Sequence, residues 1–413
     1  MQTVQPQPQA RTAGGMRRWA LFLLLLAACG GGEEPERPNV LLVTIDTLRP
    51  DHVGTGTPAL DQFLKEATWF PRARTVVPLT LPSHASMLTG LFPSRHGLHD
   101  NATPPLPPAS ARPFPLLAEQ FKDAGYSTAA FLSRAVLARE FGLASGFEIY
   151  DCPLNDRERE ETDGYVPGEE RIRAPIAWIE KPPAGKPWFV WVHLFDPHAP
   201  YRAFPGDARR APTLESDSDR VRYAGEVRRA DACFEALLSG VPKGTIVVLC
   251  TDHGEGLYDH DEETHGTLCF GSTVDALLAI RGKGFGPRVD KGLRSVADIA
   301  PTLRRLCGLP AVPGDALDLG GAGHETLVAE SLMVQAIHGW GQCFAATDGD
   351  FTLVESGPRL ELYDRRKDPG ELSPLPLNLP AYEKLGFRRT ESRREKHGVS
   401  YNPMQLVVSG QPV

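Results

Sequence analysis

Three short stretches that are apolar throughout constrain the fold of this chain more than any other feature. They are Asn39–Ile45, Trp188–Leu194 and Thr245–Cys250. A strand that is apolar on both faces is typical of a parallel sheet that is covered on both sides. Because helical patterns lie between these stretches, the sequence predicts an α/β fold with a central, mostly parallel sheet sandwiched by helices. The helical patterns are at Pro58–Ala67, Phe114–Ala124 and Ser216–Ser239.

The pattern changes toward the C-terminus. Two apolar runs, Cys343–Thr347 and Phe351–Glu355, flank an Asp-Gly pair that is typical of a β-hairpin. We therefore expect a main domain at residues 38–313, a C-terminal subdomain with a small antiparallel sheet at 314–387, and a peripheral tail at 388–413. Weaker signals predict strands at Ser127–Leu132, Ala276–Ile280 and Leu360–Tyr363, and helices at Val136–Gly146 and Val296–Cys307.

The N-terminal residues resemble an export signal. Two arginines precede an apolar run, Trp19–Leu26, that is too short to span a bilayer. Small residues then lead to Cys29, which gives residues 1–29 the pattern of a bacterial lipoprotein signal and leaves 30–37 as a flexible tether. We expect an exported protein, held at the periplasm-facing membrane of the cell envelope by a lipid on Cys29. An ordinary secretory signal is the alternative.

Export would place the six cysteines that follow Cys29 in an oxidising compartment. Several of them lie in apolar strand or helix patterns, where small buried thiols are as common as disulfides, so the pairing stays open. The net charge of −8 and the lack of a basic stripe argue against a nucleic-acid partner.

Polar side chains follow each of the three apolar stretches. Asp46 follows the first, Asp196 and His198 follow the second, and Asp252 and His253 follow the third. Because the carboxyl ends of parallel strands meet at one edge of a sheet, these groups are expected to converge. Carboxylates and imidazoles suit a divalent ion such as Zn, Mn or Ca, as one or two ions. Each Asp alone could instead form a turn or cap a helix.

The stretch Thr75–Gly90 places a hydroxyl near the same region. Pro82 and Ser83 predict the start of a short helix, with Thr80 two residues earlier. A hydroxyl at that point faces free backbone N–H groups and the positive end of the helix dipole, where an anion would bind. A threonine becomes a nucleophile only when a metal or a base activates it. Thr80 is therefore either a metal-activated nucleophile for a phosphate or sulfate ester, or a buried loop residue.

The chain as a whole, from Pro38 to Leu372, resembles the sulfatase branch of the alkaline phosphatase superfamily. The stretches that carry the resemblance are NVLLVTIDTLRPDHVG, PLTLPSHASMLTGLFPSRHG, DAGYSTAAFL, GLASGFEIYD, HLFDPHAPY, VVLCTDHGEGLYDH, THG at 264–266, SVADIAPTLRRLCGLP and ELYDRRKDPGEL. The resemblance implies a metal site at Asp46, Thr80, Asp252 and His253, with Thr80 as nucleophile.

The same resemblance implies roles for further residues. His198 and His265 fall where family members hold the leaving group or the charged oxygens, and His84 takes the place of an arginine beside the nucleophile. Asp196 could join His198 and His265 in a second metal site, or form the turn at Asp-Pro. His193 lies on the strand itself, and we expect it to be a core histidine.

Several positions depart from the sulfatase pattern. Thr80 stands where sulfatases carry a Cys or Ser that matures to formylglycine, and Thr47 replaces the second Asp of a usual pair. The Lys and His of the sulfate-binding segment are absent, and Ser133-Arg134 occupies that neighbourhood. Asp252-His253 replaces the commoner Asp-Asn. These departures favour a resemblance to relatives that use a threonine nucleophile, which are phosphodiesterases and phosphotransferases, over strict sulfatases.

The first hypothesis is therefore an exported, metal-dependent hydrolase or transferase that acts on a small anionic ester, such as a glycan, a lipid head group or a nucleotide-like compound. The alternative is a degenerate family member that binds such a group without turnover. A purely structural role in the cell envelope has only the tether in its favour. The sequence does not select the substrate.

Overall fold

The computed structural model describes residues 37–412 apart from residues 103 and 340 and the segments 153–164, 203–214, 377–386, 390–393, 397–398, 402–403 and 409–410. The proposed signal with Cys29, most of the acidic loop that follows Cys152 and most of the loop that follows Arg202 lie outside the described residues. Among the helices that are described, none has the length and apolar character needed to cross a membrane.

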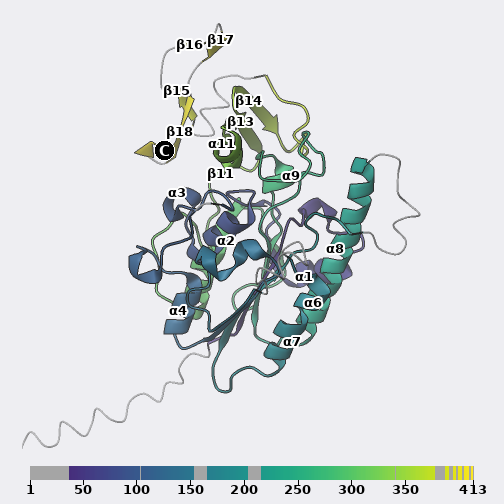
Figure 1. Ribbon diagram of the computed structural model, residues 1–413, viewed down its shortest axis with the longest axis vertical. Coiled ribbons are helices and arrows are strands. Elements are labelled where there is room, and N and C mark those ends of the chain that lie inside the picture. The colour runs from purple at the N-terminus through teal and green to yellow at the C-terminus, as the bar shows by residue number, and fades with distance from the viewer. Residues whose placement is uncertain are drawn as a thin grey trace, which may run out of the picture. The chain divides into compact units, whose positions relative to one another are not determined.

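The core of the fold is an eight-stranded sheet (Figure 1). Its central strands β5, β4, β6, β1 and β7 are parallel, whereas β8 runs antiparallel to β7. The predicted α/β fold with a mostly parallel sheet is therefore confirmed. In spatial order the strands are β5 (Ile149–Asp151), β4 (Ser127–Phe131), β6 (Trp188–Leu194), β1 (Val40–Ile45), β7 (Ile246–Thr251), β8 (Leu278–Arg281), β2 (Thr68–Trp69) and β9 (Arg288–Val289).

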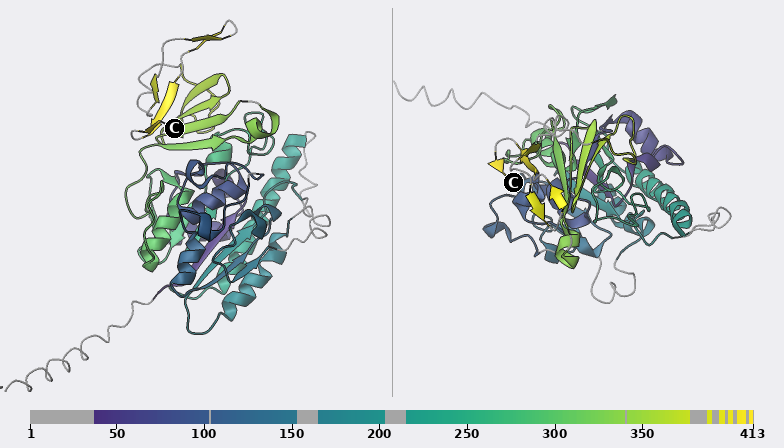
Figure 2. Two further views of the ribbon diagram at one scale, coloured as in Figure 1. Left: turned by 60° about the vertical axis from the view of Figure 1, so that its left-hand side comes forward. Right: turned by 90° about the horizontal axis from the view of Figure 1, so that it is seen from above.

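Helices cover both faces of this sheet (Figure 2). On one face, apolar side chains of α2 (Thr80–Thr89), α4 (Leu117–Asp123) and α10 (Ile299–Cys307) join one buried cluster with the sheet. On the other face, α1 (Pro58–Glu66), α7 (Arg173–Glu180) and α8 (Glu215–Ser239) join a second cluster. The shorter helices are α3 (Pro93–His96), α6 (Gly168–Arg171), α9 (Gly271–Val274) and α11 (Met333–His338), and 3-10 turns lie at Pro50–His52, Ala109–Ala111, Ala135–Leu137, Arg139–Phe141 and Val296–Asp298.

Strand alternation explains why polar groups gather at one end of the α2 face. On β1, the side chains that face α2 change from apolar Val40 and Leu42 to Thr44. Thr44 lies beside His193 on β6 and beside Cys250 on β7. Because side chains alternate along a strand, Asp46 and Asp252 come next on this same face, just past the strand ends. The site thus forms where the apolar core stops.

A second, antiparallel sheet lies near the C-terminus, as predicted. Its strands are β11 (Leu327–Ser331), β12 (Cys343–Thr347), β13 (Phe351–Ser356) and β14 (Arg359–Asp364). Cys269 and Phe270 from the loop after the third apolar strand pack into the same cluster as side chains of this sheet. Two-stranded pairing also joins β3 (Ala73–Arg74) to β10 (Arg294–Ser295), and short strands β15 to β19 lie at Phe387–Arg389, Arg394–Lys396, Val399–Tyr401, Met404–Val408 and Gln411–Pro412.

Two local predictions were wrong or incomplete. The helix and turn expected at Val136–Gly146 are a pair of 3-10 turns. The first ends at Ala138, whose backbone is extended, and the second ends at Gly142, which has a positive φ angle, as does Gly146. Gly146 also lies so close to α4 that a Cβ atom would approach the Glu119 nitrogen to 2.2 Å. Strand β11 was not predicted. None of the six cysteines in the described part of the chain forms a disulfide.

Candidate active site

Two carboxylates from neighbouring parallel strands form the floor of the site. Asp46 and Asp252 are fully buried. Neither oxygen of Asp46 has a hydrogen-bond partner among the described residues, and neither does Oδ2 of Asp252. The other Asp252 oxygen accepts the backbone N–H groups of Thr47 at 3.2 Å and His253 at 2.9 Å. Burial raises the pKa of Asp46 to about 7, against the opposing charges of His253 and Arg134. A buried carboxylate without a partner is costly unless it is protonated or paired with a cation.

His253 directs its remaining nitrogen at these carboxylates. Its Nδ1 donates to the carbonyl of Gly254 at 2.9 Å, which leaves the Nε2 lone pair free. Nε2 lies 3.7 Å from an Asp46 oxygen and 3.5 Å from Oδ2 of Asp252. Donor atoms that share a tetrahedral ion at about 2.0 Å are separated by about 3.3 Å. The three side chains therefore have the donor types and the spacing of a divalent-cation site.

Thr80 lies at the first position of α2, against the same group. The Thr80 side chain is 2% exposed, and its Oγ1 lies 3.4 Å from Nε2 of His253. The predicted helix start at Pro82 was two residues too late, because Pro82 lies in the first turn, where its missing N–H costs nothing. Ser83 does not cap the helix, and its hydroxyl instead donates to the Asp252 carbonyl at 2.7 Å. This bond ties α2 to the strand that supplies Asp252.

The resemblance placed His84 among the catalytic residues, in the position of an arginine beside the nucleophile. Its Nδ1 donates to the Thr80 carbonyl at 2.7 Å, and its Nε2 lies 3.1 Å from the Thr44 hydroxyl, which also accepts from the indole of Trp191. Burial lowers the pKa of His84 to about 3, so the ring is neutral. Since both nitrogens are occupied, His84 holds the first turn of α2 in place and is not available to a substrate.

His198 and His265 lie together with His253, as the sequence predicted. The ring centroids are 4.9 Å apart for His198 and His265, and 4.4 Å apart for His253 and His265. His198 donates from Nδ1 to the Ala199 carbonyl, and His265 Nδ1 lies 3.1 Å from a Glu255 oxygen. Burial lowers the pKa of His265 to about 4 and that of His198 well below its usual value. Both rings therefore keep Nε2 free for proton transfer.

Asp196 lies apart from the proposed cation site. One of its oxygens accepts the Gly168 N–H at 2.6 Å, and the other pairs with Arg202, which also contacts Glu226. Both oxygens are engaged in this structural network, and among the described residues Asp196 is not in a group of side chains placed to share an ion. We leave it out of the site.

Several residues of the site were not predicted. Glu255 is fully buried beside His265, and burial raises its pKa to about 7. Asn101 accepts the Leu81 N–H at 3.0 Å in the first turn of α2. The Arg134 guanidinium lies 4.8 Å from the centre of the Phe195 ring, and its charge acts on Asp46, His198 and His265. Two of these residues carried a signal in the sequence: Glu255 lies two residues after His253, and Arg134 occupies the neighbourhood of the sulfate-binding segment.

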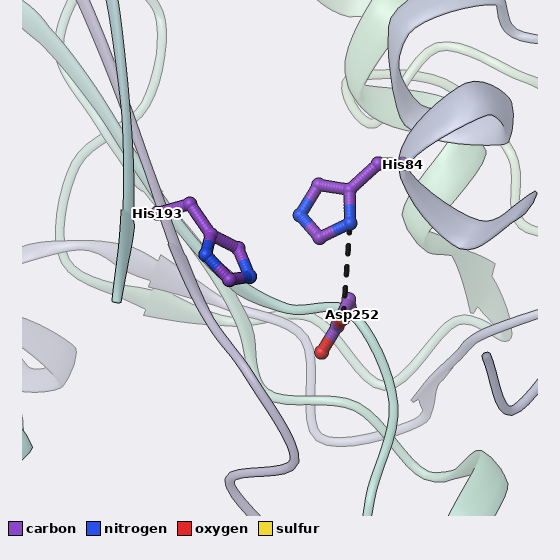
Figure 3. Close-up of side chains that lie close together, drawn as sticks. All are labelled: His84, His193 and Asp252. Atoms are coloured by element: carbon purple, nitrogen blue, oxygen red, sulfur yellow. Dashed lines mark ion pairs between the residues drawn. The ribbon is translucent and has the colours of Figure 1, made fainter. Parts of the chain in front are cut away.

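His193 is the other residue that the sequence analysis undervalued. It was expected to be a core histidine, and it is fully buried. Its ring, however, faces the site together with His84 and Asp252 (Figure 3). Its Nε2 lies 3.5 Å from Oδ2 of Asp46.

Comparison with known proteins gives a consistent set of relatives. Residues 38–309 match the sulfatase family. An endo-4-O-sulfatase of Bacteroides thetaiotaomicron is 25% identical over 368 residues, which cover 67% of this chain and 70% of the relative. Ectonucleotide pyrophosphatase/phosphodiesterase family member 1 of Homo sapiens is 31% identical over 237 residues, 53% of this chain but 24% of the relative. The solved structure of a phosphonate monoester hydrolase of Agrobacterium radiobacter has a similar fold, with a TM-score of 0.66 at 20% identity over 82% of this chain and 91% of that chain.

Proposed function

The chain belongs to the sulfatase family, and from this premise we propose that it hydrolyses esters that carry a single negative charge, with Thr80 as the nucleophile and a divalent cation as cofactor. That the chain is a hydrolase of sulfuric or phosphoric esters follows from its family and its relatives. The observation that supports the finer proposal is the contact of the Thr80 hydroxyl with His253, beside two buried carboxylates that lack partners.

The chemistry begins at the first turn of α2. A divalent cation held by Asp46, Asp252 and His253 would supply positive charge that favours loss of the Thr80 proton. Thr80 Oγ1 then bonds to sulfur or phosphorus, and the bond to the leaving oxygen breaks. Water cleaves the threonyl ester in a second step and restores the hydroxyl.

His198 and His265 supply the proton transfers of this sequence. Their Nδ1 atoms are held by acceptors, so Nε2 is the atom that takes up or gives a proton. The ring that has accepted the Thr80 proton gives it to the leaving oxygen. In the second step the same ring takes a proton from water. The buried carboxylate of Glu255 stabilises the His265 imidazolium in between.

The charge of the site favours substrates with one negative charge. Two carboxylates, Asp46 and Asp252, balance one divalent cation. The histidines with lowered pKa values are neutral. Burial raises the pKa of Glu255 to about 7, and with this side chain protonated Arg134 is the one positive charge in excess among the residues that act on Asp46 and the histidines. Sulfate esters, phosphonate monoesters and phosphodiesters carry one negative charge, whereas phosphate monoesters carry two near neutral pH.

A panel of aryl esters tests this proposal. We expect the purified, zinc- or manganese-loaded protein to hydrolyse an aryl sulfate, an aryl phosphonate or an aryl phosphodiester at least about tenfold faster, in kcat/KM, than the matching phosphate monoester. Protein treated with a chelator is the blank. A preference for the phosphate monoester would mean that the site carries more positive charge than proposed.

The proposed location rests on the sequence alone. The pattern that ends at Cys29 supports export and a lipid anchor on that residue, which would place the enzyme at the envelope membrane, facing small anionic esters outside the cytoplasm.

A further inference from the structure

His193 is a buried polar side chain at the boundary between the apolar core and the candidate site. It lies on β6 directly beside Thr44 of β1, on the sheet face that α2 covers. On this same face, apolar side chains, including Trp191, precede His193 along the direction of the strands, and Asp46 lies beyond it, at the strand ends. The residue is fully buried. Any partner of its ring must therefore come from the site itself.

Neither ring nitrogen of His193 has a hydrogen-bond partner among the described residues, and both are shielded from solvent. A neutral imidazole carries one N–H donor and one lone pair. A buried donor without an acceptor is rare in native structures. The nearest carboxylate oxygen, Oδ2 of Asp46 at 3.5 Å, is likewise without a donor.

The neighbours in Figure 3 leave Asp46 as the partner. His84 is drawn opposite His193, but both of its nitrogens are engaged by Thr80 and Thr44. Asp252 has two backbone donors on one oxygen, and its other oxygen, which has no donor, lies 3.5 Å from His253 and 3.7 Å from His84. The carboxylate oxygen that lies 3.5 Å from His193 belongs to Asp46. Asp46 has no donor on either oxygen.

The contrast with His253 separates a metal ligand from a positioning group. A histidine that binds a metal nearly always donates its second N–H to an acceptor, which fixes the ring. His253 does this through the Gly254 carbonyl. Nδ1 of His193 has no such acceptor in the described structure. Carboxylates that bind metals are in turn held by hydrogen-bond donors, and that is the role left for His193.

We propose that His193 is a positioning residue whose Nε2–H donates to Oδ2 of Asp46, so that Asp46 presents its other oxygen, the one that faces His253, to the cation. The inference rests on the cation site of the proposed function.

Metal affinity tests it with a readout that does not depend on turnover. Zn²⁺ binding to the full-length protein is measured by competition with a chromophoric chelator, and the Co²⁺ absorption spectrum reports the ligand set. His193→Ala is expected to weaken Zn²⁺ binding about 10- to 100-fold. His193→Gln retains an N–H donor of similar reach and is expected to recover most of the affinity. The Co²⁺ bands of both variants should match those of the unchanged protein at saturation.

His96→Ala is the matched control. His96 is also a buried histidine, and it bonds to Ser86 within the same part of the fold. This variant should bind Zn²⁺ with unchanged affinity.

If His193→Ala also binds Zn²⁺ as tightly as the unchanged protein, the inference is wrong while the cation site stands. Equal losses in the Ala and Gln variants together with shifted Co²⁺ bands would make His193 a ligand and overturn the positioning role. If the unchanged protein binds none of Zn²⁺, Mn²⁺ or Ca²⁺, the proposed cofactor fails and this inference fails with it.

Discussion

Replacing Thr80 by alanine is expected to lower kcat/KM for the best aryl ester by on the order of 10³-fold or more, because the attacking oxygen is lost. Thr80→Ser keeps the hydroxyl at the first turn of α2 and should retain activity within about tenfold. Steady-state kinetics measures both effects. The metal is kept at a saturating concentration because the Thr80 side chain lies against His253, a proposed metal ligand.

Thr89→Ala is the control for this experiment. Thr89 is buried on the same helix, and its hydroxyl donates to the Ala85 carbonyl at 2.6 Å, far along α2 from the site. Its loss should leave kcat/KM nearly unchanged. Substantial turnover by Thr80→Ala, above the level of the chelated blank, would remove Thr80 from the mechanism and favour direct attack by water.

Replacing Asp252 by asparagine is expected to have the second large effect. The variant should lose at least about 100-fold in Zn²⁺ affinity, and turnover at limiting metal should fall with it. An amide keeps the oxygen that accepts the Thr47 and His253 N–H groups, so the fold should survive, but the negative charge that faces His253 is lost. Metal content after dialysis, measured beside the melting temperature, reports the two effects separately.

Asp231→Asn provides the matched control for the loss of a buried carboxylate. Asp231 accepts the N–H groups of Ala59 and Leu60 at the start of α1, on the opposite face of the sheet. This variant should lower the melting temperature and leave metal content unchanged. An Asp252→Asn protein that retains full metal content would show that the cation, if there is one, is held elsewhere.

The parts of this site that could be predicted are those that backbone topology determines. Asp46 and Asp252 were expected to converge because they end neighbouring parallel strands, and they do. His253 came with Asp252, His198 followed another strand end, and Thr80 came from the predicted helix start. The resemblance to sulfatases supplied their roles and added His265. In each case the position followed from a strand end or a recognised motif.

The parts that could not be predicted depend on partners far away in the sequence. Asp196 also follows a strand, but Gly168 and Arg202 engage both of its oxygens. His84 is occupied by Thr44, from a strand 40 residues earlier. No local pattern reveals such contacts, because they arise only when the segments pack together.

His193 shows a second limit. Alternation along β6 places it on the same face as Trp191, but which face receives α2 depends on the pairing of β6 with β1. Without that register a histidine in an apolar strand is rightly expected to be a core residue. Burial was therefore predicted correctly, while the unpartnered ring beside Asp46 was not.

The central claim is that Thr80 becomes covalently esterified during turnover, and it can be tested directly. Metal-loaded protein would be mixed with a reactive aryl ester, quenched with acid within the first turnover and digested, and the peptide that contains Thr80 would be examined by mass spectrometry. We predict a sulfo or phospho group on Thr80 that appears with the first release of the aryl alcohol and disappears when the substrate is exhausted. A burst of aryl alcohol with Thr80 unmodified, or with the group on another residue, would contradict the account.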